Sequence, residues 1–228
     1  HYGTRRQRQM CIRDSNGGRY GSIYGNQLAK NLFVVANAND VPNYTGPTSV
    51  TMASSSTYGP PKDWRVKPDI TNNGVDVYSS DAISDTSYSS KTGTSMSTPA
   101  TAGTVALLQQ YYKSKNGVYM KAATAKALVI GTADEIGAHD GPDFRGGWGL
   151  VNAERAAAVI TNNGAAAVIE ETRLRSGGTY TRSITSDGRT PLAVTVVWYD
   201  PAGTPTSGNA LALVNDLDLR VIGCLLYT

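Results

Sequence analysis

The sequence predicts an α/β domain followed by part of an antiparallel β-sandwich, and two observations support this fold class. Up to Asn162, short apolar segments alternate with segments of helical periodicity, which is typical of a layered α/β domain. Beyond the turn-forming Asn162-Asn163-Gly164 the chain becomes rich in β-branched and aromatic residues. We therefore expect the α/β domain over residues 16–162 and the partial sandwich over residues 163–222.

Two strands are expected in the α/β part. The run LFVVA at 32–36 is short and apolar, like a strand that is buried on both faces of a parallel sheet. The run VDVYS at 75–79 predicts a second strand, and it follows the turn signal Asn72-Asn73-Gly74.

Three helices are expected to alternate with the strands. The first runs from about Pro99 to Lys113, because small and apolar residues recur there at close to helical spacing. These residues are Ala102, Val105, Ala106, Leu108 and Tyr112. A second helix covers 121–130, and a third follows Asn152 through AERAAAVI. The small residues of the first helix permit close packing against a sheet.

The sandwich is expected from two strand-like runs near the end of the chain. LAVTVVWYD at 192–200 combines β-branched and aromatic residues and ends at a Pro-Ala-Gly-Thr-Pro turn. LDLRVI at 217–222 alternates apolar and charged residues, as a half-buried strand does. We expect this second domain to be cut off before it is complete.

One serine has a chemically informative position, between a glycine-containing turn and a helical segment in GTSMSTP at 93–99. Ser95 is thereby placed near a helix N-terminus, where backbone N–H groups and the helix dipole stabilise negative charge. Acyl transfer needs this stabilisation for the nucleophile and for the tetrahedral intermediate. A simpler interpretation is that Ser95, Ser97 and Thr98 only cap the helix. Pro99 is expected in the first helical turn, where no intrahelical bond is lost.

The run GTSMSTPATAG resembles the nucleophile segment of the subtilisin-like serine proteases (subtilases, peptidase S8 family), in which this string opens a long buried helix. The resemblance implies that Ser95 is the nucleophile of an endopeptidase that acts on protein or peptide substrates. Two other serine-hydrolase patterns do not fit. The elbow G-x-S-x-G of α/β-hydrolase esterases needs glycine where Ser97 stands, and Lys91-Thr92-Gly93 lacks an accompanying S-x-x-K.

Further segments resemble the same family. The stretch 54–70 is similar to a serine-containing loop ending in a K-P-D-I turn, and Gly74 matches the glycine of the family's A-P-G, with Asn72 and Asn73 in place of Ala-Pro. The stretch 141–156 resembles the segment that opens the last helix of the catalytic domain. WYDPAGTP and LVNDLDLRV resemble the β-sandwich of some bacterial secreted subtilases. The implied fold is the C-terminal half of a subtilisin-like parallel-sheet α/β domain followed by a truncated antiparallel β-sandwich, and the implied location is extracellular.

The rest of the catalytic set is not evident. Subtilases take their Asp and His from segments upstream of the serine, and the imidazole must accept the serine's proton. His1 opens HYGT, which is similar to the family's His-Gly-Thr, but the apolar helix that should follow is missing. His139 comes after Ser95, in the wrong order, and is expected to be a solvated loop residue. We therefore expect this chain, taken alone, to be inactive.

The oxyanion donor is left open between two alignments. Asn39 follows the strand-like run at 32–36 and is similar to the asparagine of the family's Gly-Asn. Gly59 follows only 20 residues later, and this spacing favours the next strand of the family. In that alignment Asn39 is a loop residue and the donor lies upstream.

The two ends of the chain differ from the remainder. Residues 1–15 carry four arginines against one aspartate, a charge of +3 that equals the net charge of the whole chain. Both 1–15 and 223–228 resemble translated sequencing-adapter read-through, so we expect them to be non-native ends on an internal part of a longer protein. The near-neutral remainder gives no indication of a nucleic-acid partner. No apolar run reaches the roughly 18 residues of a transmembrane helix, so no membrane partner is expected.

No catalytic cofactor is expected, and a structural calcium ion is an open alternative. Asn215, Asp216 and Asp218 offer the oxygen ligands that calcium takes, although solvated strand-end residues are the simpler interpretation. Cys11 and Cys224 both lie in the terminal segments, which leaves the remainder without cysteine, as in many secreted bacterial enzymes. The competing function is an inactive subtilase-like scaffold whose β-sandwich recognises a polymer.

Overall fold

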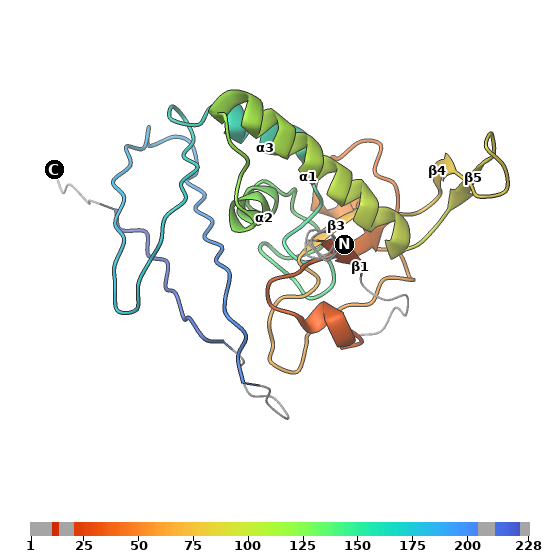
Figure 1. The fold of residues 1–228 in the computed structure, drawn as a ribbon, viewed down its shortest axis with the longest axis horizontal. Helices are drawn as coiled ribbons and strands as arrows, with labels where there is room; N and C mark the ends of the chain where they lie inside the picture. The colour runs from red at the N-terminus through yellow and green to blue at the C-terminus, as the bar shows by residue number, and fades with distance from the viewer. Residues whose placement is uncertain (1–10, 14–20, 205–212, 224–228) are drawn as a thin grey trace, which may run out of the picture.

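A small parallel sheet forms the centre of the α/β part (Figure 1). The structure, a computed structural model, describes residues 11–13, 21–204 and 213–223. The strands of the sheet are β1 (Cys11–Arg13), β2 (Phe33–Ala38) and β3 (Ile70–Asn73). They lie in the order β1-β2-β3, and neighbouring strands run parallel. Because Ala38 pairs with Asn73, β2 and β3 end at the same edge of the sheet.

Three helices accompany the sheet and confirm the expectation of a mixed α/β fold. They are α1 (Thr94–Asn116), α2 (Ala122–Gly131) and α3 (Ala153–Thr161). Helix α1 packs on all three strands, and α2 and α3 pack beside it. The second and third helices confirm their predicted bounds to within one residue. Asn152 caps α3, because its side chain accepts the backbone N–H of Arg155 at 2.8 Å.

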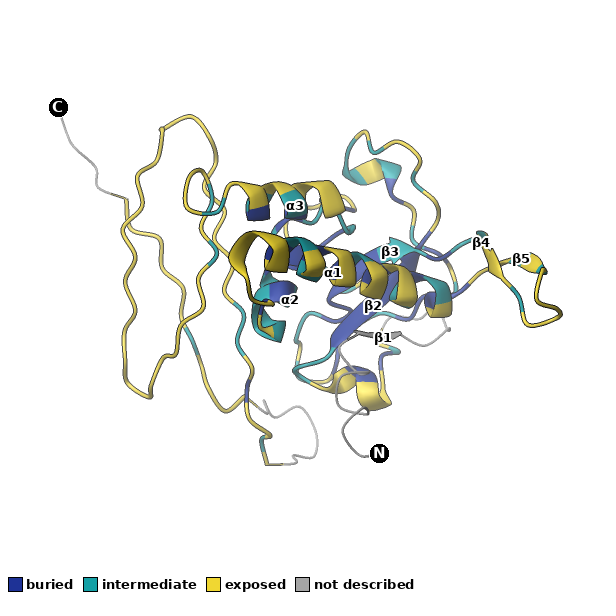
Figure 2. Cartoon of the chain, turned by 45° about the horizontal axis from the view of Figure 1, so that its top comes forward, coloured by how far each residue is buried: buried dark blue, intermediate teal, exposed yellow. Residues whose placement is uncertain are grey.

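Helix α1 starts earlier than the sequence predicts and is buried on one face only. It begins at Thr94 rather than at Pro99. Its buried residues are Thr94, Ser97, Thr101, Val105, Leu108 and Tyr112. Ala102 and Ala106, which were expected on this stripe, are exposed because the sheet covers only one side of the helix. Leu107 is 69% exposed as well, so the long buried helix implied by the resemblance has an open outer face here (Figure 2).

Strand β2 confirms the prediction at 32–36 and is buried along its whole length. Phe33 and Val35 join a core cluster with Ile70 of β3 and with apolar residues of all three helices. Full burial of each such side chain contributes roughly 1.5–3 kcal/mol. This packing holds α1 against the sheet.

The segment between β2 and α1 folds differently from its prediction. Residues 67–74, expected to form two turns, contain strand β3. The strand expected at 75–79 is largely β4 (Val77–Ser80), which pairs antiparallel with β5 (Tyr88–Lys91). The resulting hairpin projects from the body at the start of α1 (Figure 1). The consecutive asparagines favour a turn locally, but here they end a parallel strand and find partners on neighbouring elements.

A buried charge cluster joins the start of β3 to α2. Asp69 accepts hydrogen bonds from Lys67 Nζ at 2.6 Å, from Lys126 Nζ at 2.7 Å and from the backbone N–H of Val34 at 2.7 Å. Both lysines also donate to the carbonyl of Leu32. Burial lowers the pKa of Lys67 to about 8, against the opposing influence of the Asp69 carboxylate. Asp69 is therefore the counter-charge that two ammonium groups share.

The residues beyond α3 run as extended segments. In the described parts of this region, 163–204 and 213–223, the strands predicted at 192–200 and 217–222 are not formed. Most of the region is exposed, and its described residues form no ladder of backbone hydrogen bonds (Figures 1 and 2). A β-pattern yields a strand only where an aligned partner strand packs beside it. The β-sandwich over 163–222 therefore stays a prediction.

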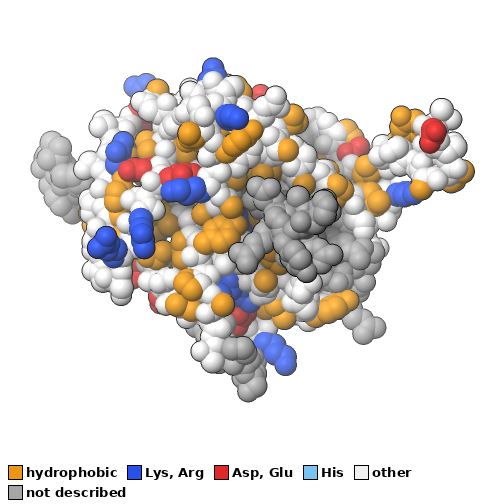
Figure 3. All heavy atoms as spheres, in the orientation of Figure 1, with side chains coloured by type: hydrophobic (Ala, Val, Ile, Leu, Met, Phe, Trp, Pro, Cys, Tyr) orange, Lys and Arg blue, Asp and Glu red, His pale blue; other side chains and the backbone are white. Residues whose placement is uncertain are grey.

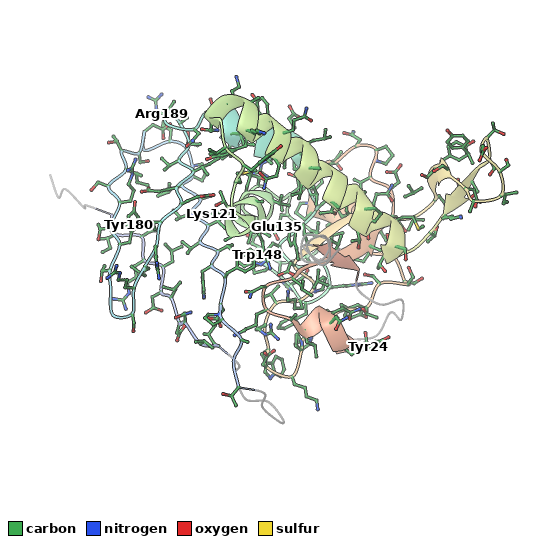
Figure 4. All side chains as sticks on the ribbon, in the orientation of Figure 1. Tyr24, Lys121, Glu135, Trp148, Tyr180 and Arg189 are labelled. Atoms are coloured by element: carbon green, nitrogen blue, oxygen red, sulfur yellow. The ribbon has the colours of Figure 1, made fainter. Side chains whose placement is uncertain are left out.

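Glu171 provides one tie between the extended region and the α/β part. Its carboxylate accepts the backbone N–H of Lys121 at 2.7 Å and the Thr124 hydroxyl at 2.6 Å. Lys121 precedes α2, which has no side-chain cap of its own (Figure 4). Glu171 thus caps α2 from a position 50 residues further along the chain.

Asp200 provides a second tie. Its buried carboxylate accepts Lys30 Nζ at 2.5 Å and the backbone N–H groups of Val214 and Asn215 at 2.9 and 2.8 Å. The amide of Asn31 also donates to the Asp200 carbonyl at 2.8 Å. Burial acts to raise the pKa of Asp200, but the bonds from Lys30, Val214 and Asn215 outweigh it and hold that pKa below its usual value. The carboxylate stays ionised and links both extended segments to the loop before β2.

Strand β1 lies within residues 1–15, the segment expected to be non-native, and nevertheless pairs in parallel with β2. The origin of that segment stays a prediction.

On the face seen in Figure 3, basic and acidic side chains are interspersed with apolar ones. Among the helices of the described ranges, none has the length and hydropathy that a membrane span requires.

Candidate active site

Ser95 lies in the first turn of α1, at the carboxyl edge of the sheet. Gly93 precedes the helix with a φ of 151°, a value that favours glycine. Its N–H donates to the carbonyl of Gly74 at 2.8 Å, just beyond the end of β3. Thr94 is fully buried, whereas Ser95 is exposed. The fold thus fixes the backbone of this turn and presents the Ser95 side chain at the surface.

None of these three hydroxyl residues is the N-cap of α1. Gly93 holds that position and has no side chain to form a cap bond. The buried Ser97 hydroxyl instead donates to the carbonyl of Thr94 at 3.2 Å, and Thr98 Oγ1 is buried without a hydrogen-bond partner. Ser95 therefore stands at the positive end of a 23-residue helix with no acidic residue in its first turn. This field stabilises an alkoxide or an oxyanion.

Pro99 lies inside α1 rather than in its first turn, where it was expected. Proline has no N–H, so the helix lacks the bond from residue 99 to the carbonyl of Ser95. The turn that carries Ser95 is consequently joined to the rest of the helix by one intrahelical bond fewer.

Asn37 is a buried polar residue of this region that sequence reasoning missed. It is fully buried within β2, where its backbone N–H donates to Ser56 Oγ at 3.1 Å and its side chain donates to Ser55 Oγ at 3.4 Å. Its Oδ1 has no hydrogen-bond partner and lies in close contact with Gly74. The available signal was an asparagine inside the otherwise apolar run LFVVANA, because a polar side chain in a buried strand is uncommon and therefore informative.

Gly74→Ala is expected to destabilise the protein by about 1–3 kcal/mol and to displace the Ser95 turn, because the added methyl has no space. A Cβ at Gly74 would lie 2.6 Å from the Gly93 carbonyl oxygen, 2.9 Å from the Ser97 nitrogen and closer still to Asn37 Oδ1. Urea unfolding measures the loss. Gly103→Ala is the matched control on α1, since a Cβ at Gly103 would meet nothing within 4 Å. Equal stability of the two variants would contradict the close packing.

The other residues considered for the catalytic set lie as follows. His139 is exposed in the loop after α2, as expected for a solvated residue. His1 lies outside the described residues. Asn39 is exposed just after β2, and its backbone N–H donates to the Thr51 carbonyl at 2.9 Å. The structure places Asn39 in a loop and leaves the choice of oxyanion donor open.

Two of the three candidate calcium ligands interact with other side chains of the chain. The side-chain amide of Asn215 donates to Asp200 at 3.0 Å, and Asp218 pairs with Arg220 at 3.9 Å. Asp216 is exposed. In the described part of the chain, no group of three or more His, Cys, Asp or Glu residues has an arrangement that could hold a metal ion.

Comparison with known proteins adds independent information on this region. Residues 13–149 match the subtilase family, peptidase S8. The chain is 25% identical over 198 residues to the serine protease/ABC transporter B family protein tagA of Dictyostelium discoideum, a match that covers 72% of this chain and 11% of that protein. The chain therefore spans about a tenth of the length of this relative.

Two solved proteases share the fold. The Clostridium perfringens CspB protease superposes with a TM-score of 0.53 at 23% identity, covering 63% of this chain and 30% of that one. The prenylagaramide maturation protease PagA superposes with a TM-score of 0.51 at 19% identity, covering 65% of this chain and 49% of that one. The family match spans more than half of the chain and includes β2, β3, α1 and Ser95. The chain belongs to the subtilase family, a family of serine peptidases.

Proposed function

We propose that this chain carries the nucleophile of a subtilisin-like serine endopeptidase and that Ser95 is that nucleophile. The observation that carries the proposal is the position of Ser95, exposed in the first turn of α1 at the carboxyl edge of the sheet. In open α/β sheets this edge is where ligands bind. We further propose that the catalytic Asp and His come from upstream residues of the parent protein. The parent protein is here the product of the uninterrupted reading frame that contains this sequence.

The proposed reaction is acyl transfer from a peptide bond. As Ser95 Oγ attacks the scissile carbonyl carbon, the upstream imidazole takes the hydroxyl proton and the carbonyl oxygen becomes an oxyanion. Collapse of this intermediate breaks the C–N bond, and the imidazolium returns the proton to the leaving amine. Water then repeats the sequence on the acyl-enzyme and restores the serine. The N-terminal field of α1 favours the charged species in each half-reaction.

A fluorophosphonate probe tests the proposal, because it phosphonylates an activated serine. The parent protein is expected to be labelled at Ser95 and to lose the label in the Ser95→Ala variant. The 228-residue chain alone is expected to stay unlabelled, since its one described histidine, His139, lies in an exposed loop. Labelling of this chain at Ser95 would overturn the proposal of an upstream base. A parent protein without label would favour the competing function, an inactive scaffold whose C-terminal region binds a polymer.

We also propose that the parent protein is secreted and that residues 163–222 belong to a β-sandwich that is incomplete here. The support is the resemblance of WYDPAGTP and LVNDLDLRV to the appended domain of secreted bacterial subtilases. Export of the parent protein into the medium of its source organism tests the first point.

A further inference from the structure

The turn that carries Ser95 is also held from outside its own helix. Pro99 cannot donate to the Ser95 carbonyl, and the N-cap residue Gly93 has no side chain that could cap α1. A nucleophile must nevertheless be held within about half an ångström of its productive position. The contacts that do this come from the carboxyl end of β3 and from Gly74, the residue that follows it.

The first contact is between backbones. The Gly93 N–H donates to the Gly74 carbonyl at 2.8 Å, and Gly74 leaves no space for a side chain against Gly93, Ser97 and Asn37. This contact sets how closely the N-terminus of α1 approaches the strand ends.

The second contact is a chain of side-chain hydrogen bonds that starts at Asn72. The Asn72 amide donates to Thr101 Oγ1 at 3.0 Å, and the Thr101 hydroxyl donates to the carbonyl of Ser97 at 3.0 Å. Asn72 Oδ1 accepts the backbone N–H of Asn73 at 2.8 Å, which fixes the orientation of the amide. Thr101 and Ser97 are fully buried, so water does not compete for the bond between them, and the bond from Asn72 is partly buried. The end of β3 is thereby tied to the second turn of α1.

We propose that Asn72 is a positioning residue for Ser95, acting through Thr101 and the Ser97 carbonyl to compensate for the intrahelical bond that Pro99 removes. That Ser95 needs positioning as a nucleophile rests on the proposed function, but the effect of the Asn72 bonds on the Ser95 turn can be tested separately. Asn72 is also where this chain departs from the family's Ala-Pro-Gly. Alanine at this position is therefore compatible with the fold, which makes Asn72→Ala a mild substitution.

The test uses a thiol as a reporter of the helix N-terminal field. In the 228-residue chain with Cys11→Ser and Cys224→Ser, Ser95→Cys introduces one thiol, whose pKa is measured from the pH dependence of alkylation by iodoacetamide. A thiol at a helix N-terminus titrates below the roughly 8.5 of free cysteine. Adding Asn72→Ala is expected to raise the thiol pKa by about half a unit, because the turn no longer holds the side chain in the field.

Thr101→Val is expected to produce the same rise, and the double variant no more than either single one, because both break one chain of bonds. Thr104→Val is the matched control, since its hydroxyl donates to the Ala100 carbonyl at 3.0 Å, the same type of bond within the same helix. The control is expected to leave the thiol pKa unchanged. If Asn72→Ala prevents folding, as judged by circular dichroism, the thiol pKa is measured in Asn72→Ser and Thr101→Val instead.

A lowered melting temperature with an unchanged thiol pKa in Asn72→Ala and Thr101→Val would overturn the proposal and leave Asn72 a purely structural residue. A rise of equal size in Thr104→Val would overturn it as well. Failure of the proposed function has a different signature: the parent protein is then not labelled at Ser95, while the shift of the thiol pKa persists.

Discussion

Ser95→Ala in the parent protein is expected to lower kcat for peptide hydrolysis by roughly 10⁴- to 10⁶-fold, the scale of loss when the nucleophile of a catalytic triad is removed. KM is expected to change little, because the hydroxyl forms its decisive bond only as the peptide carbonyl is attacked. Steady-state kinetics on a chromogenic peptide measure both constants.

Ser114→Ala is the matched control for this experiment. Ser114 is an exposed serine near the other end of α1, and its hydroxyl donates to the Tyr111 carbonyl at 2.7 Å. Its removal is expected to leave kcat unchanged. A loss of less than tenfold in Ser95→Ala, or a comparable loss in Ser114→Ala, would exclude Ser95 as the nucleophile.

Asp69→Asn is expected to destabilise the chain by about 3–5 kcal/mol, because it leaves two lysine ammonium groups without their shared counter-charge. Lys67 is only 2% exposed, and Lys126 reaches the same carboxylate from α2 at 2.7 Å. The amide retains the shape of the carboxylate, so the loss reports charge rather than a cavity. Urea unfolding at pH 6 measures it. Arg155→Gln, which breaks an exposed ion pair, is the control and is expected to lose about 1 kcal/mol or less.

The pH dependence of the same variant checks the cause. In the folded protein the pKa of Lys67 is lowered to about 8, whereas an unfolded lysine titrates near 10.4. The unfolded state therefore binds more protons between these values, and this group adds stability as the pH rises through that window. Without Asp69 the folded pKa falls further, so the deficit of the variant is expected to shrink between pH 6 and pH 9. An equal deficit at both values would contradict the electrostatic explanation.

Local sequence signals predicted the parts of the fold that depend on local periodicity. Strand β2 and helices α2 and α3 fall where apolar patterning places them, since buried strands and amphipathic helices have a fixed repeat. The string at 93–99 likewise identified the start of a long helix. Strand β3 was missed because its last two residues are asparagines, whose polarity favours a turn when no partner is in view.

The open face of α1 and the extended C-terminal region could not be predicted for a different reason. Alanine is compatible with both core and surface, so Ala102 and Ala106 carried no information on which side of α1 faces the sheet. Residues 192–200 have the composition of a strand, but a strand needs an aligned neighbour, and composition does not supply one.

The sequence by itself determined the family of this chain and the location of Ser95 near a helix N-terminus, because both are properties of a contiguous string. Only the tertiary structure decided that Ser95 is exposed at the sheet edge with Gly93 as the N-cap residue, and that Asn72 bonds to Thr101, 29 residues away. The physical reason is that a buried hydrogen bond depends on two side chains brought together by packing. The sequence around Asn72 therefore gives no indication of Thr101, and the sequence around Thr101 gives none of Asn72.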